Sequence, residues 1–210
     1  MIPVEQLATF IIASVALALV PGPDNIFVLT QSALYGRKAG VLVTIGLCSG
    51  LIFHTSVVAL GVAAVLMASA IAFNVLKFAG AIYLLYLAWR AFHASSAALQ
   101  DKKSPELTDF QLYRRGIIMN VTNPKVSVFF LAFLPQFASS SNGPMAQQIF
   151  LLGGIFIIVT FIVFGGIALL AGSLGAWLKH TPKAQIYLNR IAGFVFAALA
   201  LKLISADLQG

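Results

Sequence analysis

Charged residues are scarce in this chain, and acidic residues are the scarcest of them. Only 9% of the 210 residues are charged, with 13 Lys and Arg against 6 Asp and Glu, whereas 60% are hydrophobic. A soluble domain carries roughly 25% charged residues, so this chain has too little polar surface to stay dispersed in water. We therefore expect an integral membrane protein, with a length that allows about six helical spans of about 20 residues each.

Cysteine is almost absent, and the basic residues do not gather. Cys48 is the single cysteine, which excludes an intrachain disulfide and a cysteine-based metal site. The net charge of +7 is not a nucleic-acid signal, because the basic residues stand singly at the ends of apolar runs. The N-terminus lacks a basic region and carries Glu5, unlike a signal peptide. We expect no nucleic-acid partner, no metal and no cofactor.

The hydropathy pattern divides the chain into six apolar segments. They cover about 4–34, 40–67, 71–92, 115–137, 148–174 and 184–205. We predict an all-α integral membrane protein with six transmembrane helices in a single domain. A first three-helix repeat would cover about 1–92 and a second about 114–206, with a cytoplasmic linker at about 93–113 between them.

Two of these segments are interrupted by proline next to a charge. Pro21-Gly22-Pro23-Asp24-Asn25 interrupts the first, and Asn120-Val121-Thr122-Asn123-Pro124-Lys125 interrupts the fourth. Proline removes a backbone donor and breaks a helix, and charges inside a membrane are costly and usually functional. Broken segments at matching places in two halves indicate the binding site of a transporter.

Asp24 and Lys125 are predicted to lie at similar depth in the membrane. Asp24 precedes Arg37 by 13 residues, and Lys125 follows Arg115 by 10. At ~1.5 Å per residue, each lies roughly 15–20 Å from the cytoplasmic boundary, near the middle of a ~30 Å hydrocarbon layer. With three spans in each half, the second half must enter the membrane in the opposite sense to the first, and the alignment of Pro23-Asp24 with Pro124-Lys125 supports a repeat. We therefore predict two inverted repeats, with unwound backbone beside each charge.

A zwitterionic ligand would fit these two breaks. Its ammonium would bind Asp24 and helix-end carbonyls, and its carboxylate would bind Lys125 or amides at a half-helix N-terminus. Asn25, Asn120 and Asn123 would add neutral hydrogen bonds. The alternative interpretation is that Asp24 and Lys125 form a buried pair that only locks two helices together.

Lysine and arginine concentrate in the loops on one side of the predicted membrane protein. Ten of the 13 lie around the first, third and fifth loops, and the second and fourth loops hold none. Basic loops are typical of the cytoplasmic side. We therefore expect both termini on the outer side.

These features resemble the LysE/RhtB family of bacterial amino-acid exporters. The Pro-Gly-Pro-Asp-Asn run, the Asn-Pro-Lys run, the six apolar segments and the basic linker carry the resemblance along the whole chain. It implies a secondary transporter that exports an amino acid or a close derivative across the inner membrane by proton antiport. It does not choose the substrate. Protons and the substrate ammonium would compete for Asp24.

Other functions compete with this interpretation. An intramembrane enzyme is disfavoured, because one intramembrane acid excludes an aspartyl dyad and metal ligands do not cluster. A scaffold subunit of a membrane complex, or an exporter of a metal ion or another small solute, stays open. A homodimer also stays open.

Two further signals have structural explanations. His54 lies inside the second span, where we expect a hydrogen bond to a neighbouring helix, with a proton relay as the alternative. Several helix faces carry glycine, and because glycine has no side chain we expect these faces to pack closely against other helices. These glycines include Gly46, Gly50, Gly153, Gly154, Gly165 and Gly166.

Overall fold

The computed structural model describes residues 2–62, 70–94, 106–180 and 182–205. These residues form helices and turns, with no strand among them, so the predicted all-α fold is confirmed. The elements in chain order are α1 (Val4–Leu19), α2 (Pro23–Tyr35), α3 (Arg37–Val57), η1 (Val58–Val62), α5 (Ala70–Phe92), α6 (Asp109–Val121), α7 (Pro124–Val128), η2 (Phe129–Phe133), η3 (Leu134–Phe137), η4 (Ser140–Asn142), α8 (Met145–His180) and α9 (Pro182–Ile204).

The helices provide up to six membrane spans. In the described part of the chain, four are long and apolar enough to span alone: Arg37–Gly61, Asn74–Phe92, Met145–Ala171 and Lys183–Ile204. Two bent pairs qualify only when taken together, α1 with α2 at 58° and α6 with the segment Pro124–Phe137 at 50°. The predicted breaks in the first and fourth spans are therefore confirmed. The inverted repeat stays a prediction.

Proline determines where each broken span resumes. Gly22 is the extended N-cap of α2, with φ −157° and ψ 179°, and Pro23 opens the helix. At the second break Asn123 is the N-cap of α7, and Pro124 opens the helix. Proline suits the first helical position because its missing N–H would have no partner there. Each break therefore places a charged residue in the first turn of a new half-helix.

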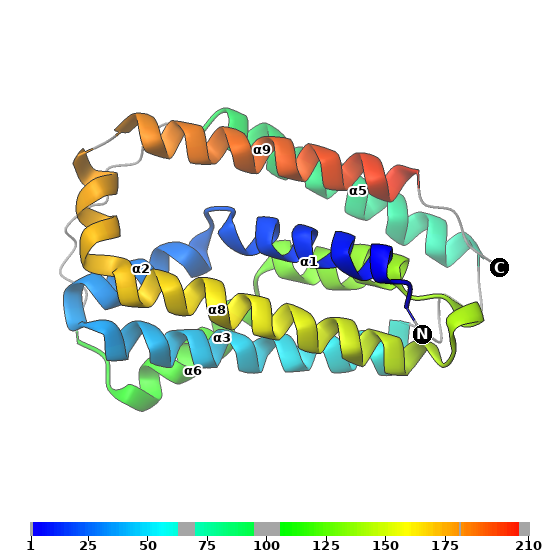
Figure 1. Ribbon diagram of the computed structural model, residues 1–210, viewed down its shortest axis with the longest axis horizontal. Coiled ribbons are helices and arrows are strands. Elements are labelled where there is room, and N and C mark those ends of the chain that lie inside the picture. Colours follow the sequence, from blue (N-terminus) through cyan, green and yellow to red (C-terminus); the bar gives the residue numbers. More distant parts are fainter. Residues whose placement is uncertain (1, 63–69, 95–105, 181, 206–210) are drawn as a thin grey trace.

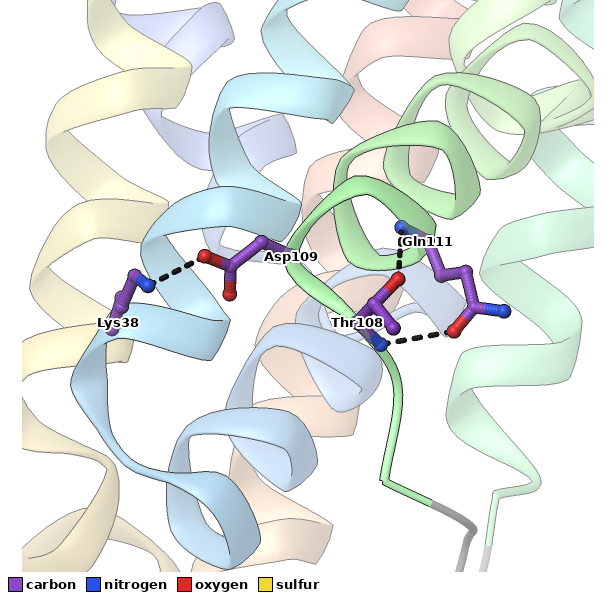
Figure 2. Close-up of polar contacts among 4 residues, drawn as sticks. All are labelled: Lys38, Thr108, Asp109 and Gln111. Atoms are coloured by element: carbon purple, nitrogen blue, oxygen red, sulfur yellow. Dashed lines mark hydrogen bonds and ion pairs between the residues drawn. The ribbon is translucent and has the colours of Figure 1, made fainter.

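The helix α6 begins earlier than hydropathy predicts. The expected start is near Arg115, but α6 begins at Asp109. Thr108 Oγ1 accepts from the Gln111 backbone N at 3.3 Å, and Gln111 Oε1 accepts from the Thr108 backbone N at 2.9 Å, which forms a capping box (Figure 2). The first turn of α6 therefore lies inside the range 93–113 predicted as a linker, because a polar cap and first turn carry no apolar signal.

The helices are arranged in three groups. Figure 1 shows α5 and α9 side by side along one face, α1 and α2 in the middle, and α8, α3 and α6 on the other side. The helix α8 runs past both α1 and α2, so it packs against both halves of the broken first span. It is also longer than the predicted 148–174.

Two apolar clusters fill the interior. The first apolar cluster joins α1, α5, α9, η2 and the N-terminal part of α8 around the rings of Phe10, Phe129 and Phe133. The second apolar cluster joins α2, α3, α6 and a later part of α8. Its buried members are Val28, Ala39, Val43, Leu47, Leu112, Phe164 and Ala168.

Glycine allows close helix contact at only some of the predicted positions. A Cβ added to Gly46 would lie 2.1 Å from the Tyr113 carbonyl oxygen, and one added to Gly153 would lie 2.4 Å from the Thr55 side chain. Gly50 likewise faces the Asn120 side chain at 2.7 Å. The packing interpretation is wrong for three others, because added Cβ atoms there would meet no described atom within 4 Å. These are Gly154, Gly165 and Gly166.

Candidate functional site

The two broken spans bring their charged residues into one region. Asp24 and Lys125 each follow the proline that opens their half-helix. Asn123 connects the two spans, because its Nδ2 donates to Asp24 Oδ2 at 2.9 Å and its Oδ1 accepts from the Lys125 backbone N at 3.0 Å. Residues separated by 99 positions in the sequence therefore meet through their side chains.

Lys125 binds the end of α1 rather than the Asp24 carboxylate. Its Nζ donates to the carbonyl oxygens of Leu17 at 3.4 Å and Val20 at 3.3 Å. The last carbonyls of a helix lack intrahelical partners, and the helix C-terminus attracts cations. Between these described residues the direct Asp24–Lys125 ion pair does not form, although the two charges lie close enough to attract each other.

Gly22 gives the Lys125 ammonium access to this position. A Cβ added at Gly22 would lie 3.2 Å from Lys125 Nζ and 3.8 Å from Asn25 Oδ1. The hydrogen on the Gly22 Cα leaves that space to the ammonium. The break in the first span therefore supplies both the free carbonyls and the room to reach them.

All five polar residues predicted for the site are buried. The exposed fraction is 2% for Asp24 and Asn120, 5% for Asn123, and 8% for Asn25 and Lys125. These side chains face the interior of the helix bundle. The prolines of the two breaks, by contrast, are exposed and shape only the backbone. They are Pro21, Pro23 and Pro124.

Three oxygen atoms in the site are buried without a hydrogen-bond partner. They are Asp24 Oδ1, Asn25 Oδ1 and Asn120 Oδ1. The amide nitrogen of Asn25 does have a partner, since its Nδ2 donates to the Ala18 carbonyl oxygen at 2.7 Å. A buried acceptor without a donor costs about 1–3 kcal/mol. The three oxygens can accept only, so they suit a ligand group that is rich in N–H donors, such as an ammonium.

Metal ligation finds no support in the described residues. They contain no group of three or more His, Cys, Asp or Glu side chains that could hold a metal ion. The donor set of the site consists instead of one carboxylate, amides and backbone carbonyls.

His54 supports the backbone next to the second break. Its Nε2 lies 3.2 Å from the Asn120 carbonyl oxygen, and its ring lies 5.5 Å from the Phe130 ring. The predicted hydrogen bond to a neighbouring helix is confirmed. The sequence does not identify the partner, because it depends on how α3 crosses α6.

The site lies where the two apolar clusters meet. Along α3 the second cluster ends at Leu47 and the first begins at Leu51, and along α8 the same change occurs between Phe164 and Phe156. Asp24 likewise follows Val20 of the first cluster and precedes Val28 of the second. The polar side chains therefore form one layer between two apolar regions.

Thr160 belongs to this layer and was not predicted. It lies midway between Phe156 and Phe164 on the buried face of α8, and its Oγ1 has no hydrogen-bond partner. One signal in the sequence points to it, because no other polar side chain occurs between residues 149 and 172. The sequence alone does not show that α8 presents this face to the broken first span.

Comparison with known proteins supports a transport function. The family model described as LysE type translocator matches residues 15–207, which include both breaks. The "Homoserine/homoserine lactone efflux protein" of Salmonella typhimurium is 34% identical over 197 residues, covering 94% of this chain and 95% of the relative. The "Uncharacterized membrane protein YrhP" of Bacillus subtilis is 28% identical over 207 residues, covering 94% of this chain and 98% of the relative. No solved structure matches the chain with significance.

Proposed function

Because the chain belongs to the LysE type translocator family, we propose that it is a secondary transporter that exports an amino acid or a close derivative. The observation that carries the proposal is the buried polar layer at two helix breaks, with Asp24 and Lys125 linked through Asn123. Charges and broken backbone are tolerated at membrane depth where they serve a ligand or a polar cavity. The Salmonella relatives named for homoserine and homoserine lactone efflux support a substrate of that class.

The arrangement suits a primary ammonium group best. Asp24 Oδ1, Asn25 Oδ1 and Asn120 Oδ1 are unpartnered acceptors, and an ammonium offers three N–H donors. Homoserine and its lactone both carry an α-ammonium. The Lys125 ammonium and the N-terminal amides of α2 are the donors available to the carboxylate or carbonyl oxygen at the other end of the substrate.

Proton antiport follows from the position of Asp24. One carboxylate cannot hold a proton and a substrate ammonium at the same oxygen, so the two ligands would exclude each other. Release of the substrate on the outer side would allow Asp24 to take up a proton and return it to the cytoplasm. The unpartnered Asp24 Oδ1 is the atom at which this exchange would occur.

The basic loops support an orientation in a bacterial inner membrane. Ten of the 13 Lys and Arg lie around one set of loops, which would be cytoplasmic. Figure 1 shows α1 beginning and α9 ending at the same end of the bundle, which would be the outer end. Export would then run from the cytoplasmic ends of α2, α3 and α6 past the polar layer.

Purified protein in liposomes tests the proposal. We expect counterflow of labelled homoserine, and uptake driven by an imposed proton gradient. Asp24→Asn should abolish the gradient-driven transport while the protein still reaches the membrane. Asp109→Asn is the matched control, because this exposed carboxylate pairs with Lys38 far from the polar layer.

Two results would contradict the proposal. Full gradient-driven transport by Asp24→Asn would remove Asp24 from the coupling mechanism and favour the interpretation that it only locks helices. Absence of counterflow across a broad amino-acid panel would favour a scaffold subunit.

A further inference from the structure

Two buried hydroxyls of the spanning helices have no hydrogen-bond partner, and they are those of Thr160 and Ser32. Ser32 faces Gly40 beside Ala168 of the second apolar cluster, whereas Thr160 lies between the two clusters. Helical Ser and Thr side chains commonly bond the carbonyl four residues earlier. Thr44 does so to Gly40 at 2.9 Å, Thr55 to Leu51 at 2.8 Å, and Ser14 to Phe10 at 2.7 Å. Thr160 is only 3% exposed, yet its Oγ1 has no partner.

Thr160 and the break in the first span both fall between the two apolar clusters. Thr160 is one helical turn from Phe156 of the first apolar cluster and one turn from Phe164 of the second. The helix α8 packs against both α1 and α2, so its buried face passes the gap between them. Cys48 of α3 contacts the carbonyl oxygen of Ile157 at 3.9 Å, which sets the middle of α3 at the same level.

The other unpartnered oxygens of the layer belong to different elements. Asp24 and Asn25 are on α2, and Asn120 is on α6. They are acceptors only, whereas a threonine hydroxyl both donates and accepts. Thr160 therefore offers, from α8, the donor that this set of acceptors lacks.

We propose that Thr160 is a specificity-determining residue whose hydroxyl contacts the substrate side chain and selects substrates that carry an oxygen on the γ-carbon. This proposal rests on the proposed function. An oxygen on the γ-carbon is common to homoserine, where it is a hydroxyl, and to its lactone, where it is the ring ester oxygen. The Thr160 hydroxyl can donate a hydrogen bond to either.

The Thr160 hydroxyl would discriminate between substrates, because it would have no hydrogen-bond partner when an apolar analogue is bound. A substrate with a methyl group in place of the oxygen would leave Thr160 Oγ1 buried without a partner, as it is in the structure. A polar group buried without its partner is penalised, so a site built around a hydroxyl rejects the apolar analogue.

The test pairs an isosteric substitution with an isosteric substrate. Norvaline is homoserine with the hydroxyl replaced by methyl, and Thr160→Val makes the same replacement in the protein. Initial counterflow rates of labelled homoserine and labelled norvaline are measured in the same proteoliposomes, and their ratio is independent of how much protein is reconstituted. We expect the wild type to prefer homoserine, and Thr160→Val to lower that preference by about fivefold, which corresponds to the loss of one neutral hydrogen bond.

Three further variants complete the design. Thr44→Val makes the same change at a buried threonine whose hydroxyl already bonds within α3, and it should keep the wild-type ratio. Thr160→Ser keeps the hydroxyl and should keep most of the preference. If Thr160→Val does not reach the membrane, Thr160→Ala removes the same hydroxyl with less bulk and should show the same loss.

The outcomes separate this inference from the proposed function. A wild type without preference for homoserine, or a Thr160→Val ratio within about twofold of the wild type, overturns the role of Thr160 and leaves export intact. Failure of every amino acid to exchange in the wild type overturns the proposed function itself.

Discussion

At the scale of single residues, Asn123 has two roles at the second break. Its Oδ1 caps α7 by accepting from the Lys125 backbone N, and its Nδ2 donates to Asp24. The first contact is structural, since an N-cap contributes about 1 kcal/mol. The second contact fixes the carboxylate that we place at the centre of binding. Substitutions can separate these two roles.

Asn123→Ser should keep the cap and lose the contact with Asp24, because a serine hydroxyl also accepts from the first-turn amides but is too short to reach the carboxylate. Asn123→Ala should lose both contacts. We expect both variants to lose most counterflow, and Asn123→Ala to be less stable than Asn123→Ser by about 1 kcal/mol, read from thermal melting in detergent.

Thr108→Ala is the matched control for Asn123, because it removes the cap of α6 far from the polar layer. This variant should melt earlier and still exchange substrate. Wild-type counterflow by Asn123→Ser would show that transport does not need the contact between Asn123 and Asp24.

The residues of the candidate site could be predicted from the sequence, but their contacts with one another could not. Proline beside a charge is a local signal, so Asp24, Lys125 and the three asparagines could be identified without a structure. The contact of Lys125 with the carbonyls of Leu17 and Val20 could not, because it depends on how α7 meets the end of α1. From charge alone, one would expect Lys125 to form an ion pair with Asp24 instead.

At the scale of helices, α3 and α6 cross with their backbones nearly in contact. Gly46 faces the Tyr113 carbonyl oxygen and the Cα of Gly116, and Gly116 in turn faces the Val43 carbonyl oxygen. Nearby, the second break is tied to α3 through Asn120 and His54. The crossing therefore determines where the Asn120 side of the polar layer lies.

Gly46→Ala should disturb this crossing, because its Cβ would lie 2.1 Å from a backbone atom that has no freedom to rotate away. Overpacking of this kind costs about 1–3 kcal/mol, so we expect a lower melting temperature in detergent and weaker transport. Gly165→Ala is the matched control, because its Cβ would meet no described atom within 4 Å. It should melt at or above the wild-type temperature, and equal melting of the two variants would contradict the predicted role of the crossing.

Helix ends were harder to predict from the sequence than helix existence. The apolar runs were sufficient to locate the spans, but α6 starts in a polar segment that its capping box holds. The glycines also look alike in the sequence, although only some of them face a neighbouring helix. Both differences arise from contacts between elements rather than from local propensity.

At the scale of the whole molecule, the orientation of the protein in the membrane determines whether transport through the polar layer is export. The second apolar cluster lies between the polar layer and the ends of α2, α3 and α6 that carry the basic loops. The first apolar cluster separates the layer from the opposite end, where α1 begins and α9 ends (Figure 1). In the proposed orientation, a substrate leaving the cytoplasm would pass the second cluster first and the first cluster last.

Single-cysteine labelling tests this orientation, because Cys48 is the only native thiol and is buried. In a Cys48→Ala background, Ser140→Cys places a thiol at an exposed position between the fourth span and α8, and Asp109→Cys places one at the exposed start of α6. We expect a membrane-impermeant thiol reagent to label Ser140→Cys in intact cells and Asp109→Cys only after permeabilisation. The reverse labelling pattern would show that the protein has the opposite orientation in the membrane, with the basic loops on the outer side. The route proposed for export would then run inward.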